Sequence, residues 1–317
     1  MNDSRTLWLI GAVLVLLTIA WAVIKVLKRR PESGIDVAIL DTFRVRVRAW
    51  WILFATLAAA FLLGHWTTVV IFGLLSFWAL REFITLTPTR LGDHRTLFWV
   101  FTIVPLLQFW SVGMGYYGWY SIMIPVYAFL LIPARIAMSG DYKRFLERTA
   151  KIQCGLLICV YCLSYAPALL TLKLPDQDTG GGPRLLFFFI LIVQLSDAFQ
   201  YAWSQLPNKH VIVPSINTTR TWEGLLGGTA SVMLVGAVLW WATPFSGVYW
   251  WMSAVMSAVI ALMGFAGSIT MSAIKRDRGV KDYGTLIEGH GGVLDRIDSI
   301  CFAAPVFFHF TLWWLGA

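Results

Sequence analysis

The chain carries ten long runs of apolar residues, and these runs constrain its fold more than any other feature. An α-helix needs about 20 mostly apolar residues to cross a lipid bilayer. Backbone polar groups inside a bilayer must be satisfied within the segment, so such runs form helices. The sequence therefore predicts an all-α polytopic integral membrane protein with about ten transmembrane helices. The runs lie near residues 7–24, 49–63, 66–80, 97–113, 116–134, 152–172, 185–203, 225–243, 248–271 and 300–316.

The composition excludes the soluble classes of protein. Hydrophobic residues make up 58% of the 317 residues, and charged residues make up only 13%. An ordinary globular domain carries about 25% charged residues, and a soluble chain could not cover its surface with half of that. The net charge of +8 raises nucleic acid as a partner. No stretch between the apolar runs is long enough for a nucleic-acid-binding module, so we expect none.

The distribution of basic residues predicts the orientation in the membrane. Four Lys and Arg residues between positions 25 and 30 directly follow the first run. Positive charge of this kind holds that end of a helix in the cytoplasm. With ten spans, 22 of the 25 Lys and Arg residues fall in loops predicted to be cytoplasmic. We therefore expect the N-terminus and the C-terminus to lie outside.

The polar segment between the last two runs carries cations and glycines that suit phosphate. Lys275, Arg276 and Lys281 supply positive charge for phosphate oxygens. Three glycines surround His290, so the backbone there can approach a ligand closely. The last apolar helix begins directly afterwards, and we expect its free N–H groups to favour an anion.

Two carboxylates stand at the start of that last helix. Asp295 and Asp298 are three residues apart and therefore share one helical face. Such a pair at a membrane boundary is costly unless it binds a metal or cations. Mg²⁺ held by one or two carboxylates together with substrate phosphates is the expected chemistry.

The segment between the seventh and eighth runs offers the second half of a site. Asp197 lies at the end of the seventh run, and Lys209 follows it. Arg220, Thr221 and Glu223 lead directly into the eighth run. Hydroxyl, Arg and Glu side chains at a helix start suit a phosphate cradle. They also suit a plain helix N-cap with Glu in the first turn, and both interpretations stay open here.

At these residues the chain resembles the phosphatidate cytidylyltransferase (CDP-diacylglycerol synthase) family. The family pattern S-x-x-K-R, four residues, K-D, then G-H-G-G and D-R-x-D is matched at every fixed position between Ser272 and Asp298. A second pattern has S-D near the end of a span, then K-H, then T-W-E-G. It is matched at Ser196-Asp197, at Lys209-His210 and at residues 221–224.

The resemblance divides the chain in two. It covers roughly the last 130 residues well. The earlier half resembles the family mainly as apolar spans, with Arg81-Glu82-Phe83 as a weak additional match. We therefore expect residues 1–172 to form transmembrane helices with basic cytoplasmic connectors. Residues 173–317 are then the catalytic transmembrane region.

The chain departs from the family pattern at three places. Bacterial members have a G-D pair ahead of S-x-x-K-R, and that Asp helps to bind metal. Here Gly267 is followed by Ser268. The family's S-P-x-K stretch is replaced by residues 217–220, and a G-K pair is replaced by Ser204-Gln205. The resemblance thus implies a divergent bacterial-type member whose number of metal ions is open.

The resemblance implies transfer of a cytidylyl group from CTP to phosphatidate, giving CDP-diacylglycerol and pyrophosphate. It implies Mg²⁺ as the cofactor, membrane lipids as partners, and a multi-pass protein of the bacterial inner membrane with its active site facing the cytoplasm. The implied residues are Lys275, Arg276, Lys281, Asp282, His290 and Asp295 for catalysis; Ser272, Lys209, Arg220, Thr221, Glu223 and Arg296 for substrate binding; and Asp295, Asp298 and Asp197 for metal.

Two other functions stay open. A CTP-dependent lipid kinase of the polyprenol or phytol type would act on a hydroxyl group and would need a base. A catalytically silent membrane scaffold would need none of the charged residues. Separately, Gly224 and Gly228 are four residues apart and permit close packing of helices, and with it a homodimer.

Overall fold

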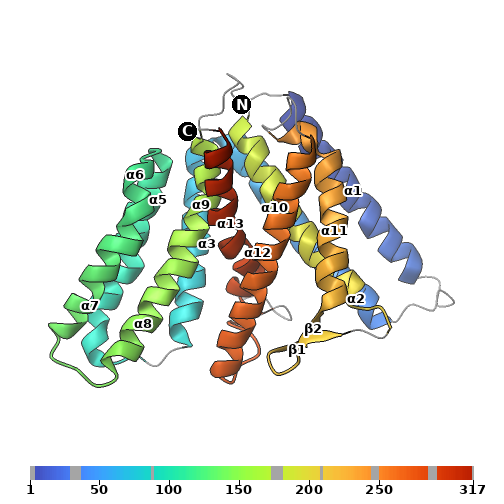
Figure 1. Ribbon diagram of the computed structural model, residues 1–317. Helices are drawn as coiled ribbons and strands as arrows, with labels where there is room; N and C mark the ends of the chain where they lie inside the picture. The colour runs from blue at the N-terminus through green and yellow to red at the C-terminus, as the bar shows by residue number, and fades with distance from the viewer. Residues whose placement is uncertain are drawn as a thin grey trace.

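The protein is almost entirely helical in the computed structural model, which describes residues 4–28, 37–86, 89–172, 181–207, 210–243, 250–284 and 291–315 (Figure 1). Within these residues, seven helices are long and apolar enough to cross a membrane. Three shorter apolar helices accompany them. The predicted all-α membrane architecture is confirmed, and each of the ten apolar runs corresponds to one of these helices. Because the apolar stretches Ile10–Val26, Trp50–Phe61 and Trp222–Val238 have only 10–17 residues, the count of ten spans stays a prediction.

Among the described residues, three unbroken helices come first, three spans built of several segments follow, and four unbroken helices come last. The unbroken helices are α1 (Ser4–Lys28), α2 (Val37–Leu63), α3 (His65–Thr85), α10 (Gly181–Trp203), α11 (Trp222–Val238), α12 (Trp250–Asp277) and α13 (Leu294–Leu315). The other segments are η2 (Leu91–Asp93), α4 (His94–Phe98), η3 (Trp99–Ile103), α5 (Val104–Gly113), α6 (Tyr117–Ile122), η4 (Met123–Ala128), α7 (Phe129–Ala137), α8 (Phe145–Gly155), η5 (Leu156–Cys162), α9 (Leu163–Ala168), η6 (Leu169–Thr171) and η7 (Trp240–Ala242).

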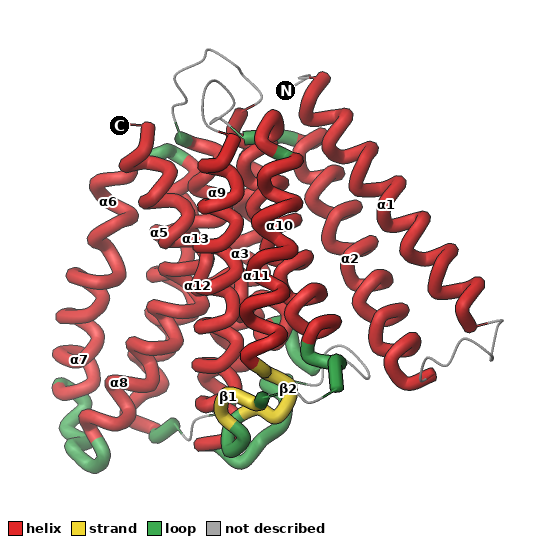
Figure 2. The backbone as a smooth tube through the Cα atoms, turned by 45° about the vertical axis from the view of Figure 1, so that its right-hand side comes forward, coloured by secondary structure: helices red, strands yellow, loops and turns green. Residues whose placement is uncertain are grey.

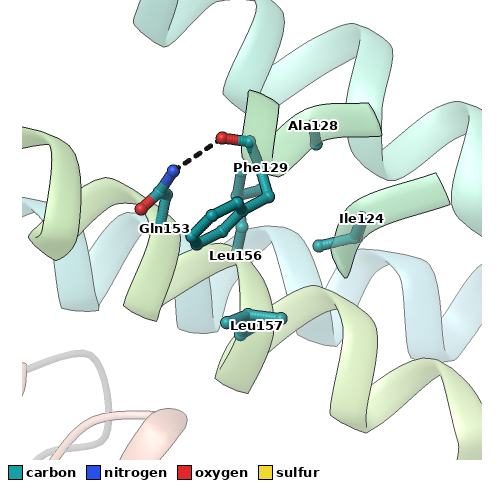
Figure 3. Close-up of a pocket in the computed structure, with 6 residues that line it drawn as sticks. All are labelled: Ile124, Ala128, Phe129, Gln153, Leu156 and Leu157. Carbon is teal, nitrogen blue, oxygen red and sulfur yellow. Dashed lines mark hydrogen bonds between the residues drawn. The ribbon is translucent and has the colours of Figure 1, made fainter. Parts of the chain in front are cut away.

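Three of the segmented spans contain a π-helical stretch, at η3, η4 and η5. Proline explains two of them, because its ring removes one backbone donor and clashes with the carbonyl four residues earlier. Pro105 lies two residues after the end of η3, and Pro125 lies within η4. Where η4 and α7 face α8 and η5, a small hollow remains, and Gln153 donates to the Phe129 carbonyl at 2.8 Å (Figure 3). Its lining residues are Ile124, Ala128, Phe129, Gln153, Leu156 and Leu157.

A β-hairpin joins α10 to α11. Its strands, β1 (Val211–Val213) and β2 (Asn217–Thr221), pair antiparallel with Val211 opposite Thr221 and Val213 opposite Asn217. The sequence analysis expected only a polar connection here. The signal was present, because both strands are rich in the β-branched residues that favour extended structure.

Small residues bring the helices that carry the site into close contact. A Cβ atom on Gly267 of α12 would lie 2.9 Å from the Asp298 carbonyl oxygen of α13. Similarly, a Cβ on Gly224 would lie 2.7 Å from the Gln200 carbonyl oxygen of α10, and one on Gly228 would lie 2.8 Å from the Gln200 nitrogen. Gly224 and Gly228 therefore pack α11 against α10 of the same chain, which removes their support for a homodimer.

The two ends of the chain approach the same end of the bundle. The start of α1 and the end of α13 lie at the top in Figure 1, and the β-hairpin and the turn between α7 and α8 lie at the opposite end (Figures 1 and 2). This is the arrangement expected for an even number of crossings. The hairpin end also carries the loops that the basic residues assign to the cytoplasm.

This arrangement predicts opposite labelling of two exposed positions. Met114 lies in the turn before α6 and is 45% exposed, and Tyr142 lies between α7 and α8 and is 82% exposed. In a variant without the four native cysteines, Met114→Cys should react with an impermeant thiol reagent on intact cells. Tyr142→Cys should react only after the membrane is opened. Labelling of both positions from one side would reject the predicted topology.

Candidate functional site

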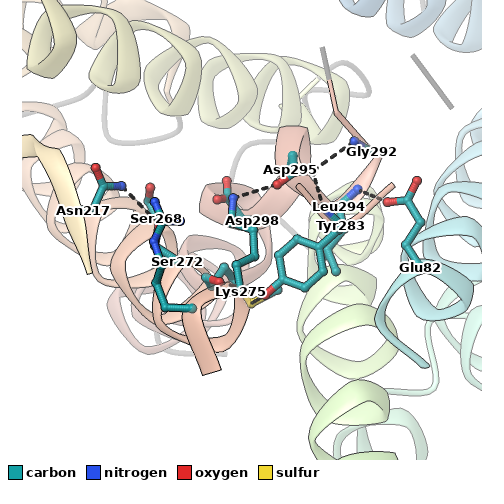
Figure 4. A network of polar contacts seen from close by, with 12 residues as sticks. Glu82, Asn217, Ser268, Ser272, Lys275, Tyr283, Gly292, Leu294, Asp295 and Asp298 are labelled. Atoms are coloured by element: carbon teal, nitrogen blue, oxygen red, sulfur yellow. Dashed lines mark hydrogen bonds and ion pairs between the residues drawn. The ribbon is translucent and has the colours of Figure 1, made fainter. Parts of the chain in front are cut away.

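Charged side chains from α3, α10, α12, α13 and β2 gather at the hairpin end of the bundle. Figure 4 labels four of them: Glu82, Lys275, Asp295 and Asp298. α10 contributes Asp197, β2 contributes Arg220 and α12 contributes Lys275. α13 contributes Asp295 and Asp298. The two polar segments that the sequence analysis singled out are therefore neighbours in space.

Asp295 ties the start of α13 to the end of α12. Its Oδ1 atom accepts from the Lys275 Nζ at 2.8 Å, and the two side chains are only 10% and 17% exposed. Its Oδ2 atom accepts from the backbone nitrogens of Tyr283 and Gly292, each at 2.9 Å. Both carboxylate oxygens are thus used within the protein, as in a helix cap that also forms an ion pair.

A second carboxylate reaches the same turn from α3. The Glu82 side chain accepts from the Val293 nitrogen at 2.9 Å and from the Leu294 nitrogen at 2.8 Å (Figure 4). The expectation that these N–H groups are free for a substrate anion is therefore wrong at Gly292, Val293 and Leu294. A carboxylate of the protein itself supplies the negative charge that a helix N-terminus favours.

Arg220 is the centre of a second polar cluster. Its guanidinium donates to Asp197 Oδ1 at 3.1 Å, to Ser268 Oγ at 2.5 Å and to Gln200 Oε1 at 2.7 Å. The Phe265 ring lies under it, with 5.8 Å from the guanidinium carbon to the ring centroid. Sequence reasoning identified Arg220 and Asp197 but missed Gln200, which is buried one turn after Ser196 and has no charge to draw attention.

Asp298 connects the two clusters. Its Oδ1 atom accepts from the backbone nitrogen of Ser299 at 2.7 Å. It also interacts electrostatically with Asp197, Arg220 and Lys275. Because α13 approaches α12 closely at Gly267, this carboxylate lies where both cations act on it. Three acidic and two basic side chains thus form one electrostatic unit.

The donor set limits how a metal could be held. Among the residues that the structure describes, no group of three or more His, Cys, Asp or Glu side chains is placed to bind a metal ion. Asp197 and Asp298 fit a Mg²⁺ ion held by one or two carboxylates and completed by substrate phosphates. Asp295 fits less well, because Lys275 and two amides occupy its oxygens. The metal role of all three residues stays a prediction.

Two of the predicted residues on α12 hold the β-hairpin in place. Ser272 accepts from the Asn217 Nδ2 at 3.1 Å, and Arg276 donates to the Ile216 carbonyl oxygen at 3.1 Å. The hairpin carries Arg220 on its second strand. Its attachment to α12 therefore fixes Arg220 relative to Ser268 and Asp197.

The start of α11 has the contacts of an N-cap. Thr221 is 1% exposed, and its Oγ1 atom accepts from the Gly224 nitrogen at 3.0 Å. Glu223 accepts from the backbone nitrogen of His210 at 3.0 Å and contacts its ring Nδ1 at 2.6 Å. Both side chains thus bind the hairpin and helix locally, which favours the N-cap interpretation over a phosphate cradle.

Tyr283 packs against the Lys275–Asp295 pair, with the Lys275 Nζ atom 5.5 Å from the centroid of its ring. Its hydroxyl donates to the Met271 carbonyl oxygen at 2.8 Å. Burial and the neighbouring Asp295 carboxylate raise the pKa of Tyr283 above its ordinary value, so this hydroxyl keeps its proton and acts as a donor. Beside it, Lys281 and Asp282 are exposed, and Arg296 is half-buried on α13. Lys209 and His290 lie outside the described residues.

Comparison with known proteins gives a family match over most of the chain. A family model described as "Cytidylyltransferase family" matches residues 44–314. The chain is 34% identical over 267 residues to the uncharacterized protein YnbB of Escherichia coli (strain K12), which covers 84% of this chain and 86% of that protein.

Several relatives carry a functional name, among them the enzymes of two bacteria. The chain is 34% identical over 130 residues to the phosphatidate cytidylyltransferase of Staphylococcus saprophyticus, covering 41% of this chain and 50% of that protein. It is 36% identical over 129 residues to the phosphatidate cytidylyltransferase of Mycobacterium leprae, covering 39% of each. The chain thus matches half or less of the length of these two enzymes.

The N-cap contact predicts a stability effect at Thr221. Thr221→Ala should lower the free energy of unfolding by about 1 kcal/mol, because the Gly224 amide loses its acceptor in a buried position. Thr221→Ser should retain the cap. Thr218→Ala, at an exposed position of the same strand, serves as the control. Unfolding of the purified protein in detergent measures the effect, and wild-type stability of Thr221→Ala would contradict the assignment.

Proposed function

The chain belongs to the cytidylyltransferase family, and we propose that it transfers a cytidylyl group from CTP to phosphatidate in a Mg²⁺-dependent reaction. The products are CDP-diacylglycerol and pyrophosphate. The observation that carries this proposal is the family match over residues 44–314, on a chain whose charged residues meet at one end of an apolar helical bundle. The two relatives named phosphatidate cytidylyltransferase support the choice of lipid.

The proposed reaction requires cations and does not require a dedicated base. The phosphate of phosphatidate is already an anion, so its oxygen can attack the α-phosphorus of CTP without losing a proton. A new P–O bond forms, and the bond between the α-phosphorus and the bridging oxygen to the β-phosphorus breaks. Pyrophosphate leaves with that bridging oxygen. What the enzyme must supply is neutralisation and alignment of two anions that repel each other.

The described cations have the placement that such alignment requires. Lys275 is held by Asp295, and Arg220 is held by Asp197, Ser268 and Gln200. Fixed charges of this kind stabilise developing charge without first having to reorganise. Lys281 is exposed two residues before Tyr283, whose amide binds Asp295, and we assign it to the more distant phosphates. Besides neutralising phosphate charge, Arg276 anchors the β-hairpin through the Ile216 carbonyl oxygen, so we assign it a structural task as well.

Asp197 and Asp298 are the residues that would hold Mg²⁺ in this scheme. When bound, the ion would neutralise phosphate charge and polarise the α-phosphoryl group. Arg220 already pairs with Asp197 at 3.1 Å, so the Asp197 carboxylate is oriented before any substrate arrives.

The proposed location follows from the two substrates. CTP is soluble in water, whereas phosphatidate lies in the bilayer, so a site that joins them belongs at a membrane face. The charged cluster lies at the hairpin end of the bundle, which the basic residues assign to the cytoplasm. We therefore propose a multi-pass protein of the bacterial inner membrane with its site facing the cytoplasm.

Product analysis separates this function from a CTP-dependent lipid kinase. Purified protein is incubated with CTP labelled at the α-phosphorus, Mg²⁺ and phosphatidate, and the lipids are extracted. A cytidylyltransferase places the label in the lipid and releases pyrophosphate. A lipid kinase, supplied with a prenol in place of phosphatidate, leaves the label in CDP. Absence of both products with either lipid would favour the scaffold alternative.

Asp295→Asn should abolish turnover while the protein still folds. Asn keeps an oxygen that can accept from the amides of Tyr283 and Gly292, and Asn is a good capping residue. It loses the charge that pairs with Lys275 and that a metal would need. Asp277→Asn, at a 69% exposed position of the same segment, is the control. A folded and active Asp295→Asn protein would reject the predicted catalytic and metal roles of Asp295.

Ser268→Asp should lower the Mg²⁺ concentration that gives half the maximal rate. Ser268 lies against Arg220, which in turn pairs with Asp197, so a carboxylate here joins the charged unit. In the native chain, few carboxylates hold the ion, so Mg²⁺ and CTP should each strengthen the binding of the other. Calorimetric titration of Mg²⁺ with and without CTP measures this coupling in both proteins.

Ser268→Asn is the matched control for this prediction, because it has the shape of Asp without the charge. Arg220 competes for the new carboxylate, and that competition sets the size of the effect. An equal Mg²⁺ requirement in the Asp and Asn variants would mean that position 268 does not act on the metal.

A further inference from the structure

Glu82 is the contact through which the first half of the chain reaches the charged site. It lies on α3, its side chain is 6% exposed, and its two carboxylate oxygens bind the amides of Val293 and Leu294. Those amides begin α13, the helix that carries Asp295 and Asp298. The contact joins residues more than 200 positions apart.

Two glycines are pressed against the Glu82 carboxylate. A Cβ atom on Gly284 would lie 2.7 Å from Oε1, and a Cβ on Gly292 would overlap the same carboxylate. Neither glycine has a positive φ angle. Glycine is therefore required at both positions by the closeness of Glu82 and not by the backbone conformation.

The neighbouring residue adds a second contact to the same segment. Phe83 stacks on Tyr283, with ring centroids 6.4 Å apart and an angle of 16° between the planes. The backbone nitrogen of Tyr283 is one of the donors to Asp295. Glu82 and Phe83 together thus contact both segments whose amides bind the Asp295 carboxylate, one at Tyr283 and one at residues 292–294.

We propose that Glu82 is a positioning residue of the transfer reaction. Its carboxylate fixes the first turn of α13, and that turn fixes Asp295 against Lys275 and sets the position of Asp298 on the same helix. Displacement of reacting groups by about 1 Å can cost roughly 100-fold in rate. This inference deepens the proposed function and rests on it, since it assigns the α3 helix a share in the same site.

Glu82→Gln tests the proposal with little change of shape. Its amide group has one acceptor oxygen, so one of the two α13 amides loses its partner. We expect faster hydrogen exchange at residues 291–298 and a fall in kcat of roughly ten- to 100-fold, with a smaller change in KM. Glu147→Gln, which removes a half-exposed carboxylate paired with Lys151 on α8, should leave both readouts unchanged.

A double-mutant cycle keeps the test decisive if one variant folds poorly. Gly292→Ala should lower kcat in the native background, because its methyl group meets the Glu82 carboxylate. In a Glu82→Ala background the methyl group has room, so Gly292→Ala should cause no further loss. Equal losses from Gly292→Ala in both backgrounds would overturn the proposal.

The outcomes separate this inference from the proposed function. If the amide hydrogens of residues 291–298 exchange faster in the Glu82→Gln variant but its kcat stays native, Glu82 has only a structural role and the inference is wrong. If the native protein does not use phosphatidate, the proposed function fails. The inference is then judged by calorimetric binding of CTP with Mg²⁺. Unchanged CTP affinity in Glu82→Gln would overturn it, and weakened affinity together with faster exchange would support it.

Discussion

The ion pair between Lys275 and Asp295 is the interaction on which the rest of the site depends. Charge at the edge of a bilayer is costly unless it is paired, and both side chains are largely withdrawn from solvent. The pair joins α12 to α13 at their adjacent ends, and the second Asp295 oxygen gathers the amides of Tyr283 and Gly292. The Asp295 carboxylate thus accepts hydrogen bonds from a cation, from a loop amide and from an amide just before α13. Movement of the start of α13 would leave all three donors without their acceptor.

The close packing of the apolar helices makes this polar arrangement possible. In a bilayer, helices associate through close packing of small residues and through hydrogen bonds between them. Gly267 lets α13 approach α12, and Gly228 lets α11 approach the Gln200 backbone of α10. These contacts bring Ser268 and Gln200 within hydrogen-bond distance of Arg220. The polar site is therefore a consequence of helix packing deeper in the membrane as well as of its own charges.

The sequence predicted the features that are local and missed those that depend on distant partners. Apolar runs of sufficient length located all ten apolar helices, and charge with glycine located the two polar segments. The roles of Thr221 and Glu223 stayed open, because an N-cap and a phosphate cradle use the same residue types. Glu82 appeared only as a weak match. Its partners Val293 and Leu294 are backbone amides, which leave no mark on the residue types. The short β-hairpin was missed as well. Its eight strand residues lie between two long apolar helices, whose hydropathy signal dominates this part of the sequence.

The charge balance of the site gives the departure at Ser268 a physical meaning. The electrostatic unit has three carboxyl groups, on Asp197, Asp295 and Asp298, and two cations, Lys275 and Arg220, so its negative excess is at most one charge. A cluster with so small an excess attracts a divalent cation weakly, and a hydroxyl at position 268 adds nothing to that attraction. Arg220 also donates to the Ser268 hydroxyl and to Asp197 together, so a cation already occupies the space between those side chains. A triphosphate would add several negative charges at once and reverse this balance. In the proposed reaction the nucleotide itself would complete the conditions for metal binding, and the protein would contribute orientation more than affinity.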